Sequence, residues 1–233
     1  MHAALRLSRP ARLKLWALLR SGDAMVDEVE RAVLDLCDEV ETRTLAYSLP
    51  EDVAVVAWDT ETTGLHGVIV QLGIVALDAT GREVGVDSRL FAPLEAFPIE
   101  PGALAVHKIT PARQAAEGEP VGKCLRAFVE LAQTASRRHI PMVAHNAAFD
   151  KRMVRNTASA IGFEPPQIES LCTMNLGRTV CTDAEGRKKR PKNRELYDLL
   201  IGGAPDDAFL HDAVEDARLT AQSFLAGKKR GLW

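Results

Sequence analysis

The sequence predicts an α/β domain in which helices flank a mixed central sheet. Three short runs rich in apolar and β-branched residues follow one another with only short turns between them, which favours neighbouring antiparallel strands. Further along the chain, another short apolar run and several segments with helical spacing of apolar residues add a strand and helices. At 233 residues the chain is long enough for one domain and an additional segment.

The first three strands are expected at Val53–Trp58, Ile69–Leu77 and Glu83–Phe91, and a loop that contains prolines follows them. The Asp78-Ala79-Thr80-Gly81 stretch is typical of a tight turn between two of these strands. The remaining elements are expected as a helix at Val121–Ser136, a strand at Ile140–Ala144, and helices at Asp150–Ile161, Asn193–Leu200 and His211–Leu225.

Residues 1–50 are expected to form a helical N-terminal extension to a domain that covers residues 51–233. Met1–Arg20 carries five basic residues and no acid, whereas Ser21–Glu41 carries eight acids. Apolar residues between Val26 and Tyr47 recur at steps of three and four, which gives one helix an apolar stripe. This stripe either packs on the domain or serves self-association or the binding of a partner such as a polymerase.

Composition favours a cytoplasmic protein. The hydrophobic content of 46% and the charged content of 26% are ordinary for a globular chain. The four cysteines have no CxxC spacing, so they are expected to be reduced thiols. No apolar run approaches the length of about 18 residues that a membrane-spanning helix needs, so no membrane partner is expected.

The most informative motif is Asp59-Thr60-Glu61-Thr62-Thr63-Gly64, directly after the first apolar run. Side chains two apart on a strand point to the same face, so Asp59 and Glu61 should project together from the strand end. Two like charges this close repel unless a proton or a cation lies between them, and oxygen ligands favour Mg²⁺ or Mn²⁺. The alternative is a solvated acidic turn.

Two later segments supply further acids. Asp150 in His145-Asn146-Ala147-Ala148-Phe149-Asp150 lies between an expected strand and helix, where it either binds metal or stabilises the helix N-terminus. His211 is expected in the first turn of the last helix, with Asp216 just over one turn later. Asp212 and Glu215 are better explained as first-turn acids that interact with the helix dipole.

The ordered set Asp59/Glu61, Asp150 and His211…Asp216 resembles the DEDDh (DnaQ-like) 3′–5′ exonucleases, a family that includes the proofreading epsilon subunit of bacterial replicative DNA polymerase. The resemblance covers about residues 51–226 and includes Val106-His107-Lys108-Ile109-Thr110 and Leu171-Cys172-Thr173. It implies a ribonuclease-H-like fold and two divalent ions, Mg²⁺ or Mn²⁺. It also implies that Asp59, Glu61, Asp150 and Asp216 bind the ions, and that His211 is the general base.

The chemistry explains the residue types. Two ions about 3.5–4 Å apart stabilise both the attacking and the leaving oxygen of an in-line displacement at phosphorus. A histidine with an ordinary pKa of about 6.5 is largely neutral near pH 7 and can accept a proton from water. The expected reaction releases nucleoside 5′-monophosphates from a 3′ end without a covalent enzyme intermediate.

Candidate substrate contacts are Thr62, Leu65, His107 and Asn146. By the resemblance, Leu65 wedges against the terminal base, although ordinary core packing explains it equally well. His107 helps to shape the substrate cleft or stabilises a loop. His145 contacts the site or is a hydrogen-bonded structural histidine.

Basic residues are concentrated in one segment although the net charge is −3. Arg178–Arg194 contains seven basic and two acidic residues, and a second cluster, Lys228-Lys229-Arg230, lies near the C-terminus. Cations beside an acidic site help to attract phosphate backbones, whereas the alternative is a solvated loop or an address signal. The aromatic content of 5% argues against a large base-stacking platform.

The expected function is a metal-dependent exonuclease that acts on single-stranded or frayed DNA 3′ ends in proofreading, repair or end trimming. An RNA-trimming exonuclease is an alternative, since discrimination depends on 2′-hydroxyl contacts. A non-catalytic polymerase accessory or nucleic-acid-binding module is another. Little sequence follows the last expected helix, which favours a free-standing enzyme over a replicase subunit that uses a long C-terminal tail.

Overall fold

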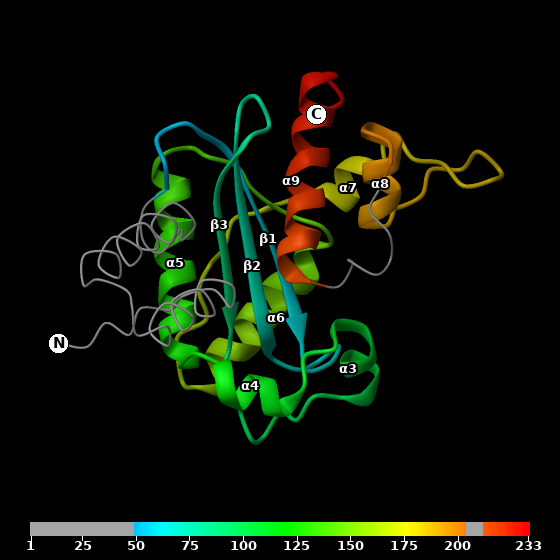
Figure 1. Cartoon of the computed structure of the whole chain (residues 1–233). Helices are drawn as coiled ribbons and strands as arrows, with labels where there is room; N and C mark the ends of the chain where they lie inside the picture. Colours follow the sequence, from blue (N-terminus) through cyan, green and yellow to red (C-terminus); the bar gives the residue numbers. More distant parts are fainter. Residues whose placement is uncertain (1–48, 204–211) are drawn as a thin grey trace, which may run out of the picture. The chain divides into compact units, whose positions relative to one another are not determined.

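Five strands form one mixed sheet in the computed structural model, which describes residues 49–203 and 212–233 (Figure 1). The strand order is β3-β2-β1-β4-β5. The first three strands pair antiparallel because short turns join them, whereas β4 and β5 run parallel to β1. The bounds are β1 (Val53–Thr62), β2 (Ile69–Asp78), β3 (Glu83–Leu90), β4 (Met142–Ala144) and β5 (Leu171–Cys172).

Helices cover both faces of this sheet. The helices α5 and α6 pack against one face, and α9 lies across β1 and β2 on the other (Figure 1). The bounds of the described helices are α3 (Pro101–His107), α4 (Pro111–Glu117), α5 (Val121–Arg137), α6 (Ala147–Ala160), α7 (Thr173–Gly177), α8 (Asn193–Leu200) and α9 (Ala213–Lys229).

The alternation of side chains along β1 supplies both hydrophobic layers. Val56 and Trp58 pack with residues of α5 and α6, whereas Val55 and Ala57 pack with residues of α9. Because the side-chain period of a strand is two, the odd-numbered residues that follow, Asp59 among them, belong to the α9 face. The strand therefore leads directly from the α9 layer into the acidic motif.

Among the described residues, each layer contains one tryptophan. Trp58 is fully buried on the α5/α6 side, where its ring centroid lies 4.8 Å from that of Phe128 and its indole N–H donates to the Ser170 hydroxyl at 3.1 Å. Trp233 packs with the α9 layer and donates its indole N–H to the carbonyl of Phe224 at 3.1 Å. Both polar indole groups are thus paired, as buried tryptophans require.

Several expected boundaries were wrong. The first strand continues four residues past Trp58 to Thr62, so the acidic pair lies within the strand and not beyond its end. The loop predicted before Val121 contains α3 and α4, each of which begins at a proline, the residue preorganised for the first helical position. Asn146, in the left-handed conformation, precedes α6, which therefore begins three residues before Asp150.

The structure confirms the α/β class with a mixed, helix-flanked sheet. The helical extension expected at residues 1–50 falls almost entirely outside the described residues, and its boundary and role stay predictions. Within residues 49–203 and 212–233, none of the helices is long and apolar enough to cross a membrane.

Candidate active site

Three carboxylates meet where β1 passes the start of α9. Asp59 and Glu61 come from β1, and Asp216 comes from the first turn of α9. One carboxylate oxygen from each lies within 4.8 Å of the others. The strand period places the first two side chains on the face that α9 covers, so the third acid reaches them from above the sheet.

A glycine allows α9 to begin this close to the sheet. Gly73 of β2 lies directly opposite Asp59 in the antiparallel register. A Cβ atom at this position would collide with the backbone of Ala213 and Val214. The missing side chain at Gly73 is therefore what permits the first turn of α9, and with it Asp216, to approach β1.

Gln71 fixes the same helix end. It lies opposite Glu61, is buried, and donates through Nε2 to the Asp212 carboxylate at 3.2 Å. Its Oε1 accepts the backbone N–H of Ala213 at 3.4 Å. Asp212 in turn caps α9 by accepting the N–H of Val214 at 2.9 Å, so the expected dipole role of this acid is fulfilled by a hydrogen bond.

Asn193, the first residue of α8, holds Asp216 from another side. Its Nδ2 donates to the backbone carbonyl of Asp216 at 2.9 Å and to the carboxylate at 3.3 Å. Its Oδ1 accepts the Thr220 hydroxyl at 3.2 Å. Sequence reasoning missed Gln71, Gly73 and Asn193, because nothing local to any of them signals a contact with a distant helix.

Asp150 is the fourth carboxylate and is almost completely buried, with 2% of its surface exposed. Its Oδ1 accepts the Thr60 hydroxyl at 2.8 Å, whereas Oδ2 is buried without a hydrogen-bond partner among the described residues. An unpaired buried carboxylate oxygen is costly. Stabilisation of the helix N-terminus does not explain this oxygen, but coordination of a cation does.

The electrostatics of the cluster favour the binding of cations. Burial raises the pKa of Asp59 well above its usual range, and the nearby charge of Asp150 adds to this effect. Burial also raises the pKa of Glu61 to about 8, with Asp216 the largest charged contributor. Burial raises the pKa of Asp150 to about 7. Such a cluster resists full ionisation unless divalent cations compensate it, and its all-oxygen donors suit hard ions such as Mg²⁺ and Mn²⁺.

His211, the expected general base, lies outside the described residues. The last helix, α9, begins at Ala213 with Asp212 as its N-cap, two residues later than the expected start at position 211. The helix starts later because Asp212, with its short acceptor side chain, is the better capping residue. The role of His211 stays a prediction.

Two of the expected substrate contacts, Thr62 and Leu65, lie at the end of β1 and in the turn after it. Leu65 is 68% exposed in the turn after the strand, so ordinary core packing does not account for it. The Thr62 hydroxyl donates to the carbonyl of Gly64 at 3.1 Å, and Asn146 is exposed just before α6.

His107 is buried and joins α3 to β1. Its Nδ1 accepts the backbone N–H of Ile109 at 2.9 Å, so Nε2 carries the proton and donates to the carbonyl of Thr62 at 3.2 Å. Burial lowers the pKa of His107, which favours this neutral form. These bonds correspond to the loop-stabilising alternative. A contact between this side chain and substrate stays a prediction.

His145 also uses both ring nitrogens. The carbonyl of Pro191 can only accept, so Nε2 donates to it at 3.0 Å and Nδ1 accepts the Thr173 hydroxyl at 3.0 Å. Burial lowers the pKa of His145 to about 4, which keeps the ring neutral. These contacts fit the alternative of a hydrogen-bonded structural histidine.

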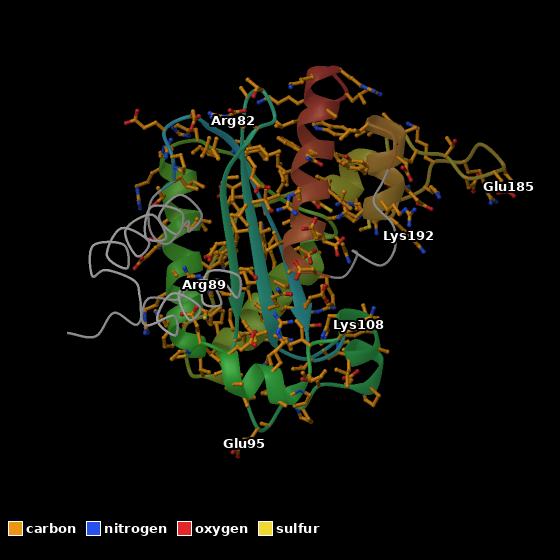
Figure 2. All side chains as sticks on the ribbon, in the orientation of Figure 1. Arg82, Arg89, Glu95, Lys108, Glu185 and Lys192 are labelled. Carbon is orange, nitrogen blue, oxygen red and sulfur yellow. The ribbon has the colours of Figure 1, made fainter. Side chains whose placement is uncertain are left out.

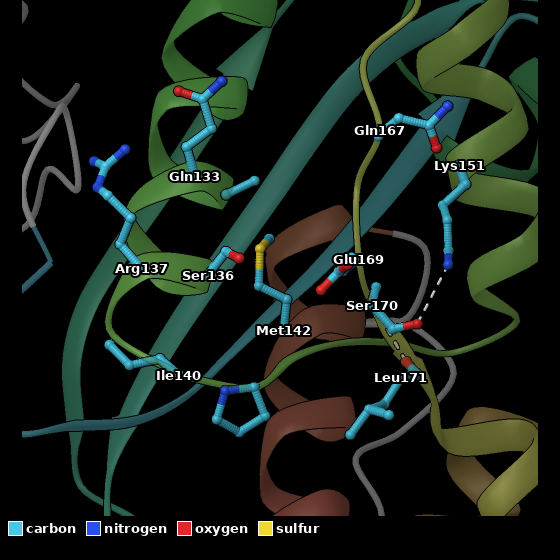
Figure 3. Close-up of a pocket in the computed structure, with 12 residues that line it drawn as sticks. Gln133, Ser136, Arg137, Ile140, Met142, Lys151, Gln167, Glu169, Ser170 and Leu171 are labelled. Carbon is cyan, nitrogen blue, oxygen red and sulfur yellow. Dashed lines mark hydrogen bonds between the residues drawn. The ribbon is translucent and has the colours of Figure 1, made fainter.

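A hollow of about 700 Å³ lies apart from the carboxylates, on the α5 side of the sheet (Figure 3). Side chains at the C-terminal end of α5, Met142 and the segment before β5 line it, and Lys151 reaches in to donate to the carbonyl of Ser170 at 3.3 Å. None of the four clustered acids lines this hollow.

A mixed sheet whose central strand carries clustered carboxylates, completed by acids from two helices, defines the class of ribonuclease-H-like nucleases. The chain belongs to the exonuclease family, whose model matches residues 56–224. This membership confirms the resemblance stated from the motifs.

Individual relatives agree with the family. The chain is 33% identical over 200 residues to a DNA polymerase III subunit epsilon-like protein of Rhodobacter capsulatus, covering 81% of this chain and 26% of that protein. It is 33% identical over 165 residues to exodeoxyribonuclease 10 of Escherichia coli K12, covering 70% of this chain and 63% of that protein. The chain thus spans about a quarter of the first relative and less than two thirds of the second.

A solved structure is similar as well. Exonuclease X in complex with 5′-overhanging duplex DNA matches with a TM-score of 0.53 and 28% identity, covering 77% of this chain and 93% of that one.

Proposed function

We propose that the protein is a metal-dependent 3′→5′ exonuclease that hydrolyses the terminal phosphodiester bonds of single-stranded or frayed DNA. The observation that carries the proposal is the cluster formed by Asp59, Glu61 and Asp216, together with the unpaired buried oxygen of Asp150. These four carboxylates provide enough oxygen ligands for two divalent ions while leaving room for water and phosphate.

The family resemblance, together with the described positions of the acids and of Leu65, supports a role for each protein group. Asp59, Glu61, Asp150 and Asp216 would hold the ions, which would supply the positive charge that activates water and stabilises the leaving oxygen. His211, two residues before α9, takes the proton from the attacking water. Leu65, exposed directly after β1, packs against the terminal base and orients the 3′ end. The product is a nucleoside 5′-monophosphate.

DNA is favoured over RNA by what the relatives act on or bind. One relative is named an exodeoxyribonuclease, and a solved neighbour is bound to 5′-overhanging duplex DNA. RNA trimming is the alternative activity, because the same carboxylate site can cleave either polymer and discrimination depends on 2′-hydroxyl contacts. A polymerase-accessory role draws support from the epsilon-like relative, but the acid cluster is unnecessary for a pure binding module.

The test is digestion of 5′-labelled single-stranded DNA, single-stranded RNA and mismatched duplex DNA with Mg²⁺ or Mn²⁺. The expected result is stepwise shortening of DNA, release of nucleoside 5′-monophosphates in chromatography, and complete loss of cleavage with EDTA. Cleavage should also disappear in Asp59→Asn but persist in Glu95→Gln, a matched change of an exposed acid in the loop after β3 (Figure 2). Faster shortening of RNA would favour the trimming alternative, and binding without cleavage would favour the accessory module.

A further inference from the structure

The segment Arg178–Arg194, here named the basic arm, joins α7 to α8 and leaves the body of the domain. Figure 1 shows it as the yellow loop that extends beyond α8, and Figure 2 places Glu185 at its far end. Its two sides are joined by backbone hydrogen bonds, from Lys189 N–H to the carbonyl of Cys181 at 3.1 Å and from Asp183 N–H to the carbonyl of Arg187 at 2.9 Å. The arm is therefore a hydrogen-bonded hairpin and not an irregular loop.

Both acids of the arm accept hydrogen bonds that close its turn. The Asp183 carboxylate accepts the backbone N–H of Arg187 at 2.8 Å and the guanidinium Nε of the same residue at 2.8 Å. Glu185 accepts a second guanidinium N–H of Arg187 at 2.8 Å. One arginine thus compensates the acids of the turn, and the other cations on the arm are not neutralised by them.

The remaining cations divide into two groups. Lys189 and Arg194 form ion pairs with Glu195 and Asp198 of α8, with N–O distances of 3.0 and 4.0 Å. Arg178, Lys188, Arg190 and Lys192 are exposed, and none of them forms an ion pair within the described part of the chain.

The extended backbone explains why the two groups differ. Lys188 and Arg190 are two residues apart, so they point to the same side, opposite to Lys189 between them. Because Lys189 is directed toward α8, its two neighbours face away from that helix and toward solvent.

The base of the arm is anchored to the acidic site. The carbonyl of Pro191 accepts the Nε2 proton of His145, which directly follows β4. Asn193, two residues further, donates to both the backbone and the carboxylate of Asp216. The free cations therefore extend from a fixed point at the rim of the carboxylate cluster.

We propose that Lys188 and Arg190, with Arg178, bind the sugar–phosphate backbone of the strand being degraded, several nucleotides upstream of its 3′ end. The inference rests on the proposed function and adds the surface that holds the polymer. An acidic cluster repels a polyanion, so a positive surface at its rim compensates that repulsion, and phosphate contacts of this kind carry no sequence preference.

The test is the salt dependence of DNA binding by Lys188→Ala/Arg190→Ala, measured by fluorescence anisotropy in an Asp59→Asn background that prevents cleavage. Each lost phosphate contact lowers the slope of log K against log salt by about 0.7 for a single strand, so the slope should fall by about 1.4. The dissociation constant for an oligonucleotide of roughly 20 nucleotides should rise about tenfold at low salt. The matched control is Lys228→Ala/Arg230→Ala, which removes equal charge from the end of α9 and should leave the slope unchanged.

A second readout separates binding from chemistry. The p-nitrophenyl ester of thymidine 5′-monophosphate contains one scissile phosphodiester and no further phosphates for the arm to bind. The arm variant in an otherwise wild-type chain should keep its kcat/KM for this ester and lose about tenfold in kcat/KM for long DNA. A wild-type slope in the arm variant, an equal loss on the ester, or an equal effect of the control would each overturn the proposal. If wild type cleaves neither substrate but the slope still changes, the proposed function fails while the arm is upheld.

Discussion

The two faces of β1 begin alike and end differently. Val56 and Trp58 on one face and Val55 and Ala57 on the other are all buried in apolar layers. Beyond them, the α5/α6 face stays closed, whereas the α9 face changes to Asp59 and Glu61 where α9 begins. The comparison teaches that the site requires no unusual backbone. A change of residue type on one face of a regular strand, opposite a helix end, is sufficient.

The closed face still contributes one element to the site. Thr60, between the two acids in sequence, points to the α5/α6 side and donates its hydroxyl to Asp150 at 2.8 Å. This bond brings an acid from α6 to the end of β1. One strand therefore positions its own two carboxylates and, through the residue between them, the fourth.

The largest effect is expected from a substitution on the acidic face of β1. Asp59→Asn should lower exonuclease activity about a thousandfold, because several kcal/mol of barrier lowering depend on the ions and each 1.4 kcal/mol is a factor of ten. The metal-free variant should unfold at an equal or higher temperature than wild type, since a buried charge with like-charged neighbours is removed. Initial rates and thermal denaturation in EDTA measure both.

The control lies on the opposite face. Leu72 of β2 is fully buried and lies opposite Thr60 of β1. The Leu72→Ala variant should lose about 2–5 kcal/mol of stability. Its kcat below the unfolding transition should stay close to wild type. Equal losses of stability in both variants would contradict the division of the strand into a packing face and a chemical face.

The next largest effect is expected from a substitution that pushes the start of α9 away from the sheet. In Gly73→Ala the new Cβ collides with the backbone at the start of α9, so the helix must shift. Activity should fall about a hundredfold, since a displacement of about 1 Å at a catalytic group has that cost, and stability should fall by about 1–3 kcal/mol. Gly102→Ala, where a Cβ meets no atom within 4 Å, is the control; it should leave activity unchanged and raise stability by up to about 1 kcal/mol, because alanine favours the helix α3 more than glycine does.

The pH dependence of stability sharpens the comparison further. In the metal-free protein the pKa of Glu61 is raised to about 8 and that of Asp150 to about 7, so the folded state binds more protons than the unfolded state up to about pH 8. The free energy of unfolding should therefore fall as pH rises from about 6.5 to 8. Below this range His145, with its pKa lowered to about 4, has the opposite effect.

Urea unfolding across this range, in EDTA and in Mg²⁺, measures the effect. Mg²⁺ should restore more stability at pH 8 than at pH 6.5, because it replaces the protons that the acids lose. In EDTA, Glu61→Gln should reduce the fall of the unfolding free energy between about pH 6.5 and 8. A metal-free protein that gains stability over the same interval would refute the assignment of raised pKa values to the cluster.

The smallest effect concerns the exposed turn. Leu65→Ala should leave stability unchanged within about 0.5 kcal/mol, as expected for an exposed side chain. Cleavage of frayed duplex ends should slow several-fold, whereas hydrolysis of the thymidine ester should change less, since only the polymer end offers a base to be separated from its neighbour. Equal slowing on both substrates would argue against a wedge.

Sequence patterns predicted the structure correctly where the contacts that determine it are local. The common face of Asp59 and Glu61 follows from strand alternation, and the apolar runs located the sheet strands β1 to β4. Gln71 and Asp212 are 141 residues apart, and neither residue type signals the other. The prolines at the start of α3 and α4 were interpreted as loop residues, because proline is common both in loops and at the first position of a helix. A two-residue strand such as β5 is too short for any periodicity.

The distribution of tryptophans has a practical consequence. Trp58 reports from the layer beneath α5 and α6, and Trp233 from the layer beneath α9. Trp16 is the third tryptophan of the chain. Replacing Trp16 and either of the others by phenylalanine would leave one tryptophan per molecule, so tryptophan emission, excited where tyrosine does not absorb, could time the closure of each layer separately during refolding.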